Sequence, residues 1–194
     1  DVYGIVSSDE LPVTEDAPLR PVSPYGMSKA IADLVGLNAF LAYGQNVIRA
    51  RSFNHFGPGQ DRNAVCSGLA ARIVECEATN RSSIRVGNLD VRRDLTDVRD
   101  VVRAYRLLAA EGKSGVAYNV CSGVAVSIRE VLEALVLLSE CPIRLESDPA
   151  LFRPVDLEVL CGSPARIHSD TAWFPRRSLE ATLLEVLNEW RQRN

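Results

Sequence analysis

Apolar side chains recur along the chain with two different spacings, one helical and one extended. The helical spacing predicts helices over residues 24–43, 64–79, 97–108, 127–138, 164–170 and 178–192. Short runs rich in β-branched and other apolar residues predict strands at 46–53, 83–87, 116–121 and 143–146. Strands that alternate with helices are typical of an α/β fold with a mostly parallel sheet.

The helix over residues 24–43 has a clear start signal. Ser23 can accept a hydrogen bond from a free backbone N–H, and Pro24 fits the first turn, where its missing N–H is not needed. Ser127 and Glu130 have the spacing of a capping box at the start of a later helix. Residues 1–24, punctuated by four prolines, predict a strand exit and a long surface loop, and residues 54–60 predict another loop.

Two residues of the first helix can carry proton chemistry. Tyr25 and Lys29 are four positions apart, so they lie on one face of the helix. A phenol has a pKa of about 10, which makes it a poor acid or base at neutral pH, but a nearby ammonium favours the phenolate and lowers that pKa. The pair is therefore a candidate proton donor and acceptor for a sugar or alcohol hydroxyl. The alternative is a surface tyrosine above a solvated lysine.

Composition and charge narrow the classes of partner. The chain has 194 residues, of which 46% are hydrophobic, and a formal net charge of −3. This suits one globular domain or a large piece of a bigger one, and it gives no overall attraction for nucleic acid. No apolar run approaches the roughly 20 residues that span a bilayer, so we expect no membrane partner. Five cysteines without a C-x-x-C pair and only two histidines predict no metal site and a cytoplasmic location.

Several segments carry a resemblance to a known family, in order along nearly the whole chain. They are residues 1–4, 20–29, 51–60, 86–100, 118–123 and 153–156. With them the chain resembles the C-terminal two thirds of an extended short-chain dehydrogenase/reductase of the nucleotide-sugar epimerase/dehydratase family. The resemblance implies an α/β fold with part of a Rossmann-like, doubly wound parallel sheet, whose N-terminal half is missing, and a smaller α/β substrate-binding lobe contributed in pieces. It places residues 1–56 and 97–141 in the NAD(P)-binding domain, and residues 57–96 and 142–194 mainly in the lobe.

The resemblance also implies catalytic and cofactor-binding roles. Tyr25 matches the tyrosine that donates a proton to the sugar C4 oxygen while hydride arrives from the nicotinamide. Lys29 matches the lysine that lowers the tyrosine pKa and binds the nicotinamide ribose. The resemblance implies that Tyr25 and Lys29 are also cofactor-binding residues. Ser52 and Phe53 match backbone positions beside the nicotinamide carboxamide, with ordinary sheet packing as the alternative.

Further residues match substrate-binding positions of the family. Asn54 matches a substrate-contacting asparagine, although a turn residue that bonds its own backbone is the alternative. Arg93 and Arg153 match the arginines that bind the substrate diphosphate, and a planar guanidinium can hold phosphate oxygens in a bidentate manner. Val86 and Asn88 match positions that line the nucleotide base pocket.

The resemblance favours one reaction within the family. Residues 54–60 and 87–90 are most similar to those of the members that reduce the 4-keto group of a GDP-4-keto-6-deoxy-hexose with NAD(P)H, forming GDP-D-rhamnose. The GDP-mannose 4,6-dehydratases share the Gly-Asn-Leu-Asp segment but depart from the Gly-Pro-Gly-Gln loop. A dehydratase or an epimerase stays open as the second hypothesis, and a catalytically inactive fragment that binds a nucleotide or pairs with another chain as the third.

Two family features are absent from this chain. They are the glycine-rich turn that holds the cofactor pyrophosphate and the serine or threonine that completes the catalytic set. We therefore expect a fragment of a longer protein, whose cofactor is NAD or NADP. Because the family commonly dimerises through the Tyr-x-x-x-Lys helix and the next long helix, we expect a homodimer through helices 24–43 and 64–79. Leu37, Phe40 and Leu41 are candidates for its contact face.

Overall fold

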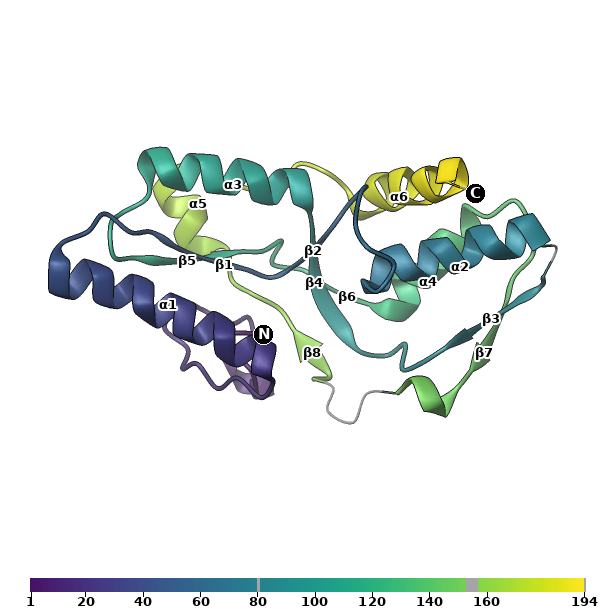
Figure 1. The fold of residues 1–194 in the computed structure, drawn as a ribbon, viewed down its shortest axis with the longest axis horizontal. Coiled ribbons are helices and arrows are strands. Elements are labelled where there is room, and N and C mark those ends of the chain that lie inside the picture. Colours follow the sequence, from purple (N-terminus) through teal and green to yellow (C-terminus); the bar gives the residue numbers. More distant parts are fainter. Residues whose placement is uncertain (80, 153–156, 194) are drawn as a thin grey trace. The chain divides into compact units, whose positions relative to one another are not determined.

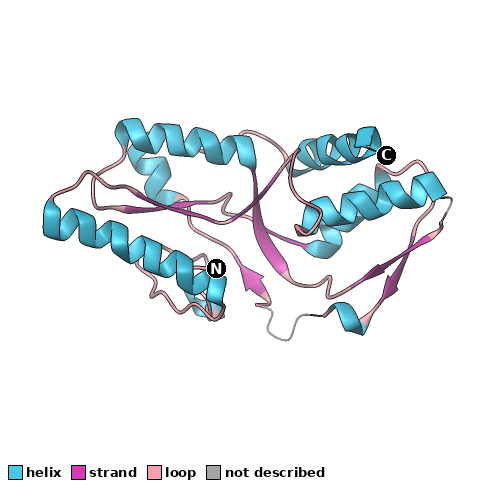
Figure 2. Ribbon diagram, viewed as in Figure 1, coloured by secondary structure: helices cyan, strands magenta, loops and turns pink. Residues whose placement is uncertain are grey.

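The computed structural model describes residues 1–79, 81–152 and 157–193, and it is a mixed α/β structure (Figures 1 and 2). The α-helices are α1 (Pro24–Tyr43), α2 (Val65–Thr79), α3 (Val98–Glu111), α4 (Ile128–Leu137), α5 (Ala165–Thr171) and α6 (Leu179–Arg193). The strands are β1 (Arg49–Ser52), β2 (Asn54–Phe56), β3 (Ser83–Val86), β4 (Arg92–Asp97), β5 (Ala117–Val120), β6 (Ala125–Ser127), β7 (Arg144–Ser147) and β8 (Val159–Leu160). Two short 3₁₀ helices, η1 (Ser8–Glu10) and η2 (Pro149–Leu151), complete the described elements.

The strands form three small sheets. β1 pairs in parallel with β5, with Ser52 opposite Val120. β3 pairs in parallel with β7, with Val86 opposite Ser147. β2, β4 and β6 are neighbours in that order in a third sheet, where β8 also pairs with β4. The parallel pairs, each joined through intervening helices, confirm the predicted α/β class.

The predicted helix starts are confirmed in detail. Ser23 caps α1 by accepting a hydrogen bond from the Gly26 amide at 3.0 Å, with Pro24 in the first turn. Ser127 and Glu130 form the expected capping box at the start of α4, each side chain accepting from the backbone N–H of the other. Asp97 begins α3 by accepting from the Arg99 amide. These starts follow from local side-chain chemistry, which the sequence carries in full.

The strand predictions are less accurate. The predicted strand 46–53 is observed as β1 alone, and β2 occupies the start of the predicted loop 54–60. The pattern also missed β4, which begins with two arginines and an aspartate. Both strands are defined by pairing with distant segments, and a local apolar pattern does not report such pairing.

The N-terminal segment is not simply a surface loop. Tyr3 and Val13 are buried, and they pack in a core cluster with Phe53, Cys121 and Leu160. Single parallel bridges join Gly4 to Arg20 and Val13 to Gly162. The segment therefore contributes buried residues to the core of unit 1, while Ser7, Ser8 and Asp9 are exposed.

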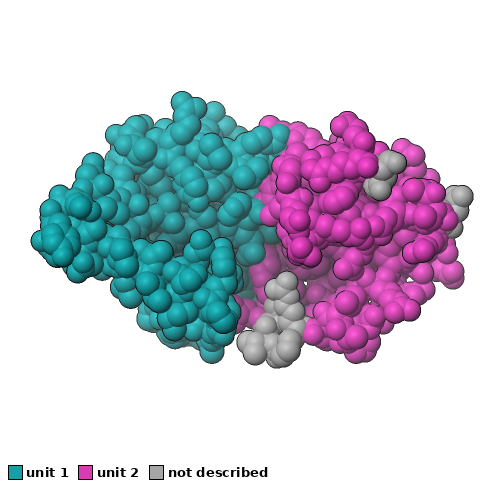
Figure 3. Space-filling view, viewed as in Figure 1, with its two compact units in different colours: residues 1–55, 94–125, 159–176 teal, residues 56–93, 126–158, 177–194 magenta. Residues whose placement is uncertain are grey.

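The chain divides into two compact units (Figure 3). Unit 1 comprises residues 1–55, 94–125 and 159–176, and unit 2 comprises residues 56–93, 126–158 and 177–194. These bounds differ from the expected ones, because α4 packs against α2 and α6 in unit 2, whereas α5 packs against α3 and β5 in unit 1. The assignment of cofactor and substrate to the two lobes stays a prediction.

Unit 1 is built around the β1–β5 pair. Figure 1 shows α1 on one side of these strands and α3 and α5 on the other. The core between the strands and the latter two helices contains Leu108, Tyr118, Ile167 and Trp173, and the Trp173 indole N–H donates to the Asp100 carbonyl at 3.0 Å. Buried aromatic rings of this kind contribute a large share of the apolar area removed from water.

Unit 2 is built around a helical group. α2, α4 and α6 pack against one another, and α2 also contacts β3. Within this unit Ile73, Leu132, Leu135, Leu183 and Leu187 are fully buried. No helix among the described residues is both long and apolar enough to cross a membrane.

One face of α2, a helix of the predicted dimer, is buried inside unit 2. Its apolar residues Leu69, Ile73 and Val74 are buried inside unit 2, so they are not available to a second copy of the chain. On α1, Leu41 is exposed, whereas Leu37 and Phe40 are half-buried. A homodimer through α1 and α2 therefore stays a prediction.

Candidate functional site

Tyr25 and Lys29 lie one turn apart near the start of α1. The Lys29 Nζ is 5.2 Å from the centroid of the Tyr25 ring, within the range of a cation–π contact. The tyrosine side of the pair is open, since Tyr25 is 60% exposed. The structure thus brings together the phenol and the ammonium that the sequence singled out, at a place that a ligand can reach.

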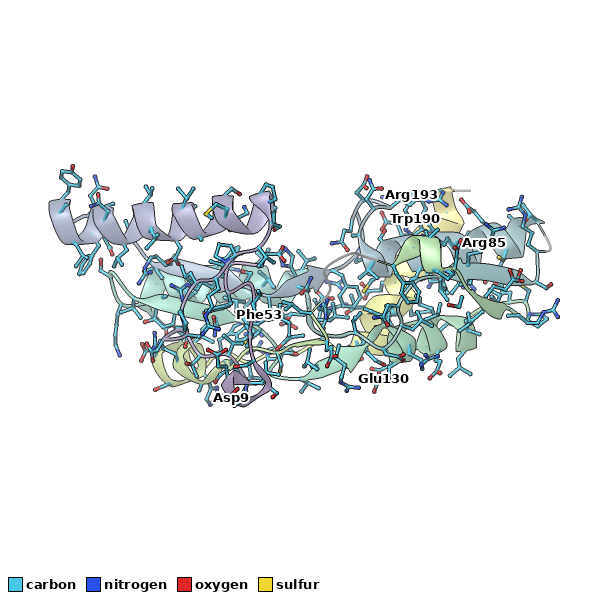
Figure 4. The ribbon with its side chains drawn as sticks, turned by 90° about the horizontal axis from the view of Figure 1, so that it is seen from below. Asp9, Phe53, Arg85, Glu130, Trp190 and Arg193 are labelled. Carbon is cyan, nitrogen blue, oxygen red and sulfur yellow. The ribbon has the colours of Figure 1, made fainter. Side chains whose placement is uncertain are left out.

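Ser52, Phe53 and Asn54 follow one another from the end of β1 into β2. The Ser52 Oγ is 2.6 Å from the hydroxyl of Tyr105 on α3. Phe53 (labelled in Figure 4) is only 7% exposed, its ring lies 5.9 Å from that of Tyr3, and its amide donates to the Val120 carbonyl. The Phe53 side chain and amide therefore have the contacts of ordinary sheet packing. A cofactor role for Ser52 and Phe53 stays a prediction.

Asn54 is an exposed residue at the first position of β2. Asn54 therefore lies in a strand, whereas the alternative to a substrate contact was a turn residue that bonds its own backbone. Its neighbour His55 has its Nδ1 3.0 Å from the Phe53 carbonyl, a contact in which Nδ1 carries the proton and donates. A substrate contact through Asn54 stays a prediction.

A charged cluster joins α1 to β1, and the sequence analysis did not identify it. Asp33 accepts two hydrogen bonds from Arg51 and one from Arg49, at 2.7–2.9 Å. Burial acts to raise the pKa of Asp33, but the two arginines outweigh it and hold the pKa below its usual value. The sequence offered only weak signals: Asp33 is four residues beyond Lys29 on the helix, and Arg49 and Arg51 have the two-residue spacing of one strand face.

The candidate base-pocket residues lie in unit 2. Val86 ends β3 with a buried side chain, and its carbonyl accepts from the Asp148 amide at 2.9 Å. The Asn88 Oδ1 accepts a hydrogen bond from the Asp90 amide at 3.0 Å, which is the contact of an Asx-turn. Both residues therefore have structural contacts, and their binding role stays a prediction.

Arg93 occupies the second position of β4. Its Nη1 donates to its neighbour's carbonyl at Arg92 and to the Leu157 carbonyl, at 2.8 and 2.7 Å. Arg153, the other predicted diphosphate ligand, lies outside the described residues. The structure therefore ties Arg93 to the chain four residues beyond Arg153, without placing the two guanidiniums relative to each other.

Unit 2 also contains a pocket of about 620 Å³. Its lining includes three arginines and three carboxylates: Arg72, Arg81, Arg85, Glu75, Glu146 and Asp148. Leu151 of η2 closes against Gly87, where a Cβ would come within 2.7 Å of the Leu151 carbonyl oxygen. The volume is within the usual range for a small-molecule pocket, roughly 300–1,000 Å³.

Two of the cysteine thiols are poor nucleophiles at neutral pH. Burial raises the pKa of the Cys66 thiol to about 12, and burial together with the Asp94 charge raises that of Cys161 to about 11. A thiol with such a pKa stays protonated at neutral pH. Among the described residues, no group of three or more His, Cys, Asp and Glu side chains is placed to hold a metal ion.

Comparison with known proteins gives a family match over most of the chain. The family model for GDP-mannose 4,6 dehydratase matches residues 1–186. A GDP-6-deoxy-D-mannose reductase from Pseudomonas aeruginosa is 37% identical over the whole chain, which covers 64% of that protein. The chain therefore spans just under two thirds of this relative.

Solved structures agree with the sequence comparison. The structure of RMD from Pseudomonas aeruginosa, complexed with NADPH, has a TM-score of 0.93 and 35% identity, covering 100% of this chain and 64% of that one. A Thermus thermophilus UDP-glucose 4-epimerase complexed with NAD has a TM-score of 0.83 and 26% identity, covering 98% of this chain and 60% of that one. The matches confirm the expected Rossmann-like α/β fold. The family model, the 37% identical relative and the fold all agree. The chain therefore belongs to the GDP-mannose 4,6-dehydratase family of extended short-chain dehydrogenase/reductases, whose members act on nucleotide sugars.

Proposed function

We propose that the full-length protein uses NAD(P)H to reduce the 4-keto group of a GDP-4-keto-6-deoxy-hexose. The observation that carries the proposal is the Tyr25–Lys29 pair on α1, with the Lys29 ammonium 5.2 Å from the tyrosine ring. The 37% identity to a GDP-6-deoxy-D-mannose reductase along the whole chain supports this reaction among those of the family. A bound nicotinamide cofactor supplies the hydride, and this chain's residues supply the proton and the binding contacts.

Tyr25 is the proposed general acid. Reducing a ketone places negative charge on its oxygen, and a phenol hydroxyl positioned there can donate the proton. In this proposal the positive charge of Lys29 stabilises the phenolate that remains after the proton has left. The exposure of Tyr25 supports this role, because a proton donor must be accessible to its substrate.

The nucleotide part of the substrate is the proposed ligand of unit 2. Arg93 and Arg153 supply positive charge for the two phosphates, and Val86 and Asn88 supply contacts for the base. The half-buried position of Arg93 supports this assignment, since partial removal from water strengthens a charge-assisted hydrogen bond.

A dehydratase is the second candidate, because the matching family model carries that name. The two reactions differ in their consumption of cofactor. A reductase oxidises one NAD(P)H for each sugar reduced, whereas a 4,6-dehydratase regenerates its cofactor within each turnover and releases water.

The test uses the full-length protein with two substrates in parallel. GDP-4-keto-6-deoxy-mannose is supplied with NADH or NADPH, and GDP-mannose is supplied with the oxidised cofactors. The proposal predicts stoichiometric loss of NAD(P)H with the keto sugar, formation of a GDP-6-deoxy-hexose, and no conversion of GDP-mannose. Conversion of GDP-mannose to the keto sugar without net cofactor consumption establishes the dehydratase instead. The ratio of the rates with NADH and NADPH gives the cofactor preference.

A further inference from the structure

Asp33 is held from two sides by arginines of β1. The Arg51 Nε donates to Oδ1 at 2.9 Å and its Nη2 donates to Oδ2 at 2.8 Å, which is a bidentate pair. The Arg49 Nη1 donates to the same Oδ2 at 2.7 Å. The Asp33 and Arg51 side chains are only 6% and 8% exposed, so water screens this pair little.

The arginines are themselves fixed. The remaining nitrogen of Arg51, Nη1, donates to the Glu15 carbonyl at 2.9 Å and to the Tyr3 hydroxyl at 3.2 Å. The Arg49 Nη2 donates to the Gly115 carbonyl at 3.1 Å. Because both arginines also belong to the β1–β5 pair, Asp33 is attached to the central strands of unit 1.

α1 has few other means of attachment. Within this helix, all of which the structure describes, Gly26 and Ala30 are the only buried residues. Ile31, Leu34 and Val35 are each more than half exposed, so apolar packing contributes little along the middle of the helix. Near its end the Phe40 ring fills the space above Gly115. The charged cluster at Asp33 is therefore the main polar attachment of the helix to its strands.

Helix geometry connects this attachment to the candidate catalytic pair. Tyr25, Lys29 and Asp33 follow one another at intervals of four residues, and each interval turns about 40° round a helix of 3.6 residues per turn. Asp33 can therefore face the strands while Tyr25 faces outward. Because a helix is stiff over two turns, a rotation or slide at Asp33 displaces Tyr25 as well.

We infer that Asp33, held by Arg51 and Arg49, is a positioning residue. It fixes the rotation of α1 about its axis and its position along that axis, and thereby places Tyr25 and Lys29 for proton transfer. The bidentate pair suits this role, since two parallel hydrogen bonds define an orientation as well as a distance. Misplacement by about 1 Å can lower a rate by about a hundredfold. The inference rests on the proposed function.

The test compares three single variants in the full-length protein. Asp33→Asn removes the charge, Arg51→Lys keeps a charge but loses the fork, and Asp170→Asn is the matched control. Asp170 lies in unit 1, away from α1, and it accepts from Lys113 and Tyr118 at 2.7 Å. Asp33→Asn and Arg51→Lys should lower kcat by tenfold to a hundredfold with little change in KM for the nucleotide sugar. Asp170→Asn should keep kcat close to that of the unmodified protein.

A double-variant measurement separates positioning from general loss of stability. In a Tyr25→Phe background, Asp33→Asn should lower the residual rate by less than threefold, because the group that it positions is already absent. An equal loss of kcat in both backgrounds, or an equal loss in Asp170→Asn, overturns the inference. If Asp33→Asn does not fold, Arg51→Lys decides the question, and an unchanged kcat in that variant also overturns it.

Hydrogen exchange provides a readout that does not need activity. Backbone amides of residues 25–33 should exchange at least tenfold faster in Asp33→Asn than in the unmodified protein, and Asp170→Asn should leave them unchanged. Unchanged exchange in Asp33→Asn contradicts the inference. If the unmodified full-length protein reduces no keto sugar while α1 still loosens in this way, the proposed function fails and the attachment of α1 by Asp33 stands.

Discussion

The ammonium nitrogen of Lys29 lies 5.2 Å from the centroid of the Tyr25 ring, one turn along the same helix. This distance places a positive charge over the ring of the one tyrosine that the sequence marks for proton chemistry. Tyr25 is exposed, so the pair does not resemble a buried packing contact. The relationship supports an acid whose conjugate base is stabilised by a neighbouring cation.

Replacing Lys29 should impair both chemistry and cofactor binding. Lys29→Met in the full-length protein removes the charge that stabilises the phenolate, so we expect kcat to fall by roughly tenfold to a thousandfold. The Kd of NAD(P)H, measured by titration, should rise. Lys113→Met is the control, since Lys113 pairs with Asp170 and is 67% exposed. If both variants behave alike, the role given to Lys29 is wrong.

Replacing Arg93 should weaken substrate binding without affecting the cofactor. Arg93→Ala removes a charge-assisted hydrogen bond, which contributes about 1.5–3 kcal/mol, so the Kd of GDP should rise by roughly tenfold to a hundredfold. Arg93→Lys should recover only part of the affinity, because it keeps the charge and loses the bidentate geometry. Calorimetric titration with GDP and with NAD(P)H gives both values.

Arg129→Ala supplies the control for this measurement. Arg129 lies in unit 2 and pairs with Asp90 on the surface, with 48% of its side chain exposed. Its replacement should leave the Kd of GDP nearly unchanged. A normal Kd in Arg93→Ala, or an equal weakening in Arg129→Ala, contradicts a specific phosphate contact by Arg93.

A half-buried ion pair in unit 2 should make stability depend on acid pH. Glu77 on α2 accepts two hydrogen bonds from Arg191 on α6, at 2.8 and 2.9 Å, and further ones from Ser139 and the Glu140 amide. The hydrogen bonds from Arg191 are the main cause of a lowered Glu77 pKa. The contribution of the pair is therefore complete above the usual glutamate pKa, and it is lost as the pH falls through the native one.

The corresponding variant is Glu77→Gln in the full-length protein. At pH 7 it should lower the melting temperature by several degrees, since hydrogen bonds to charged groups contribute about 1.5–3 kcal/mol. The difference from the unmodified protein should shrink steadily between pH 5 and pH 3. Glu140→Gln is the control, because Glu140 is 77% exposed and 4.0 Å from Arg191. A difference that grows as the pH falls would falsify the stated role of Glu77.

Local features of this chain could be predicted from its sequence, whereas long-range pairing could not. The cap by Ser23, the capping box of Ser127 and Glu130, and the Tyr25–Lys29 contact all lie within four residues. By contrast, β4 begins with charged residues and becomes a strand through pairing with distant segments. The prolines of the N-terminal segment indicated a loop, and nothing in the local pattern indicated the pairing of Val13 with the distant Gly162.

The same distinction applies to the candidate site. The catalytic pair is a short motif on one helix, so spacing alone indicated it. The Asp33 cluster joins residues 16 and 18 positions apart, and neither arginine has a mark that distinguishes it from a solvated one. Phe53 shows the converse case, because a residue matched to the cofactor site by resemblance has its amide bonded within the sheet.

The most direct test of the central claim is the rate of keto-sugar reduction by Tyr25→Phe in the full-length protein. This change removes a single hydroxyl from an exposed side chain, so the fold should be unaffected. We predict that kcat falls by roughly a hundredfold to ten-thousandfold while the Kd of NAD(P)H changes less than threefold. A Tyr25→Phe protein that reduces GDP-4-keto-6-deoxy-mannose at close to the normal rate contradicts the assignment of Tyr25 as the acid.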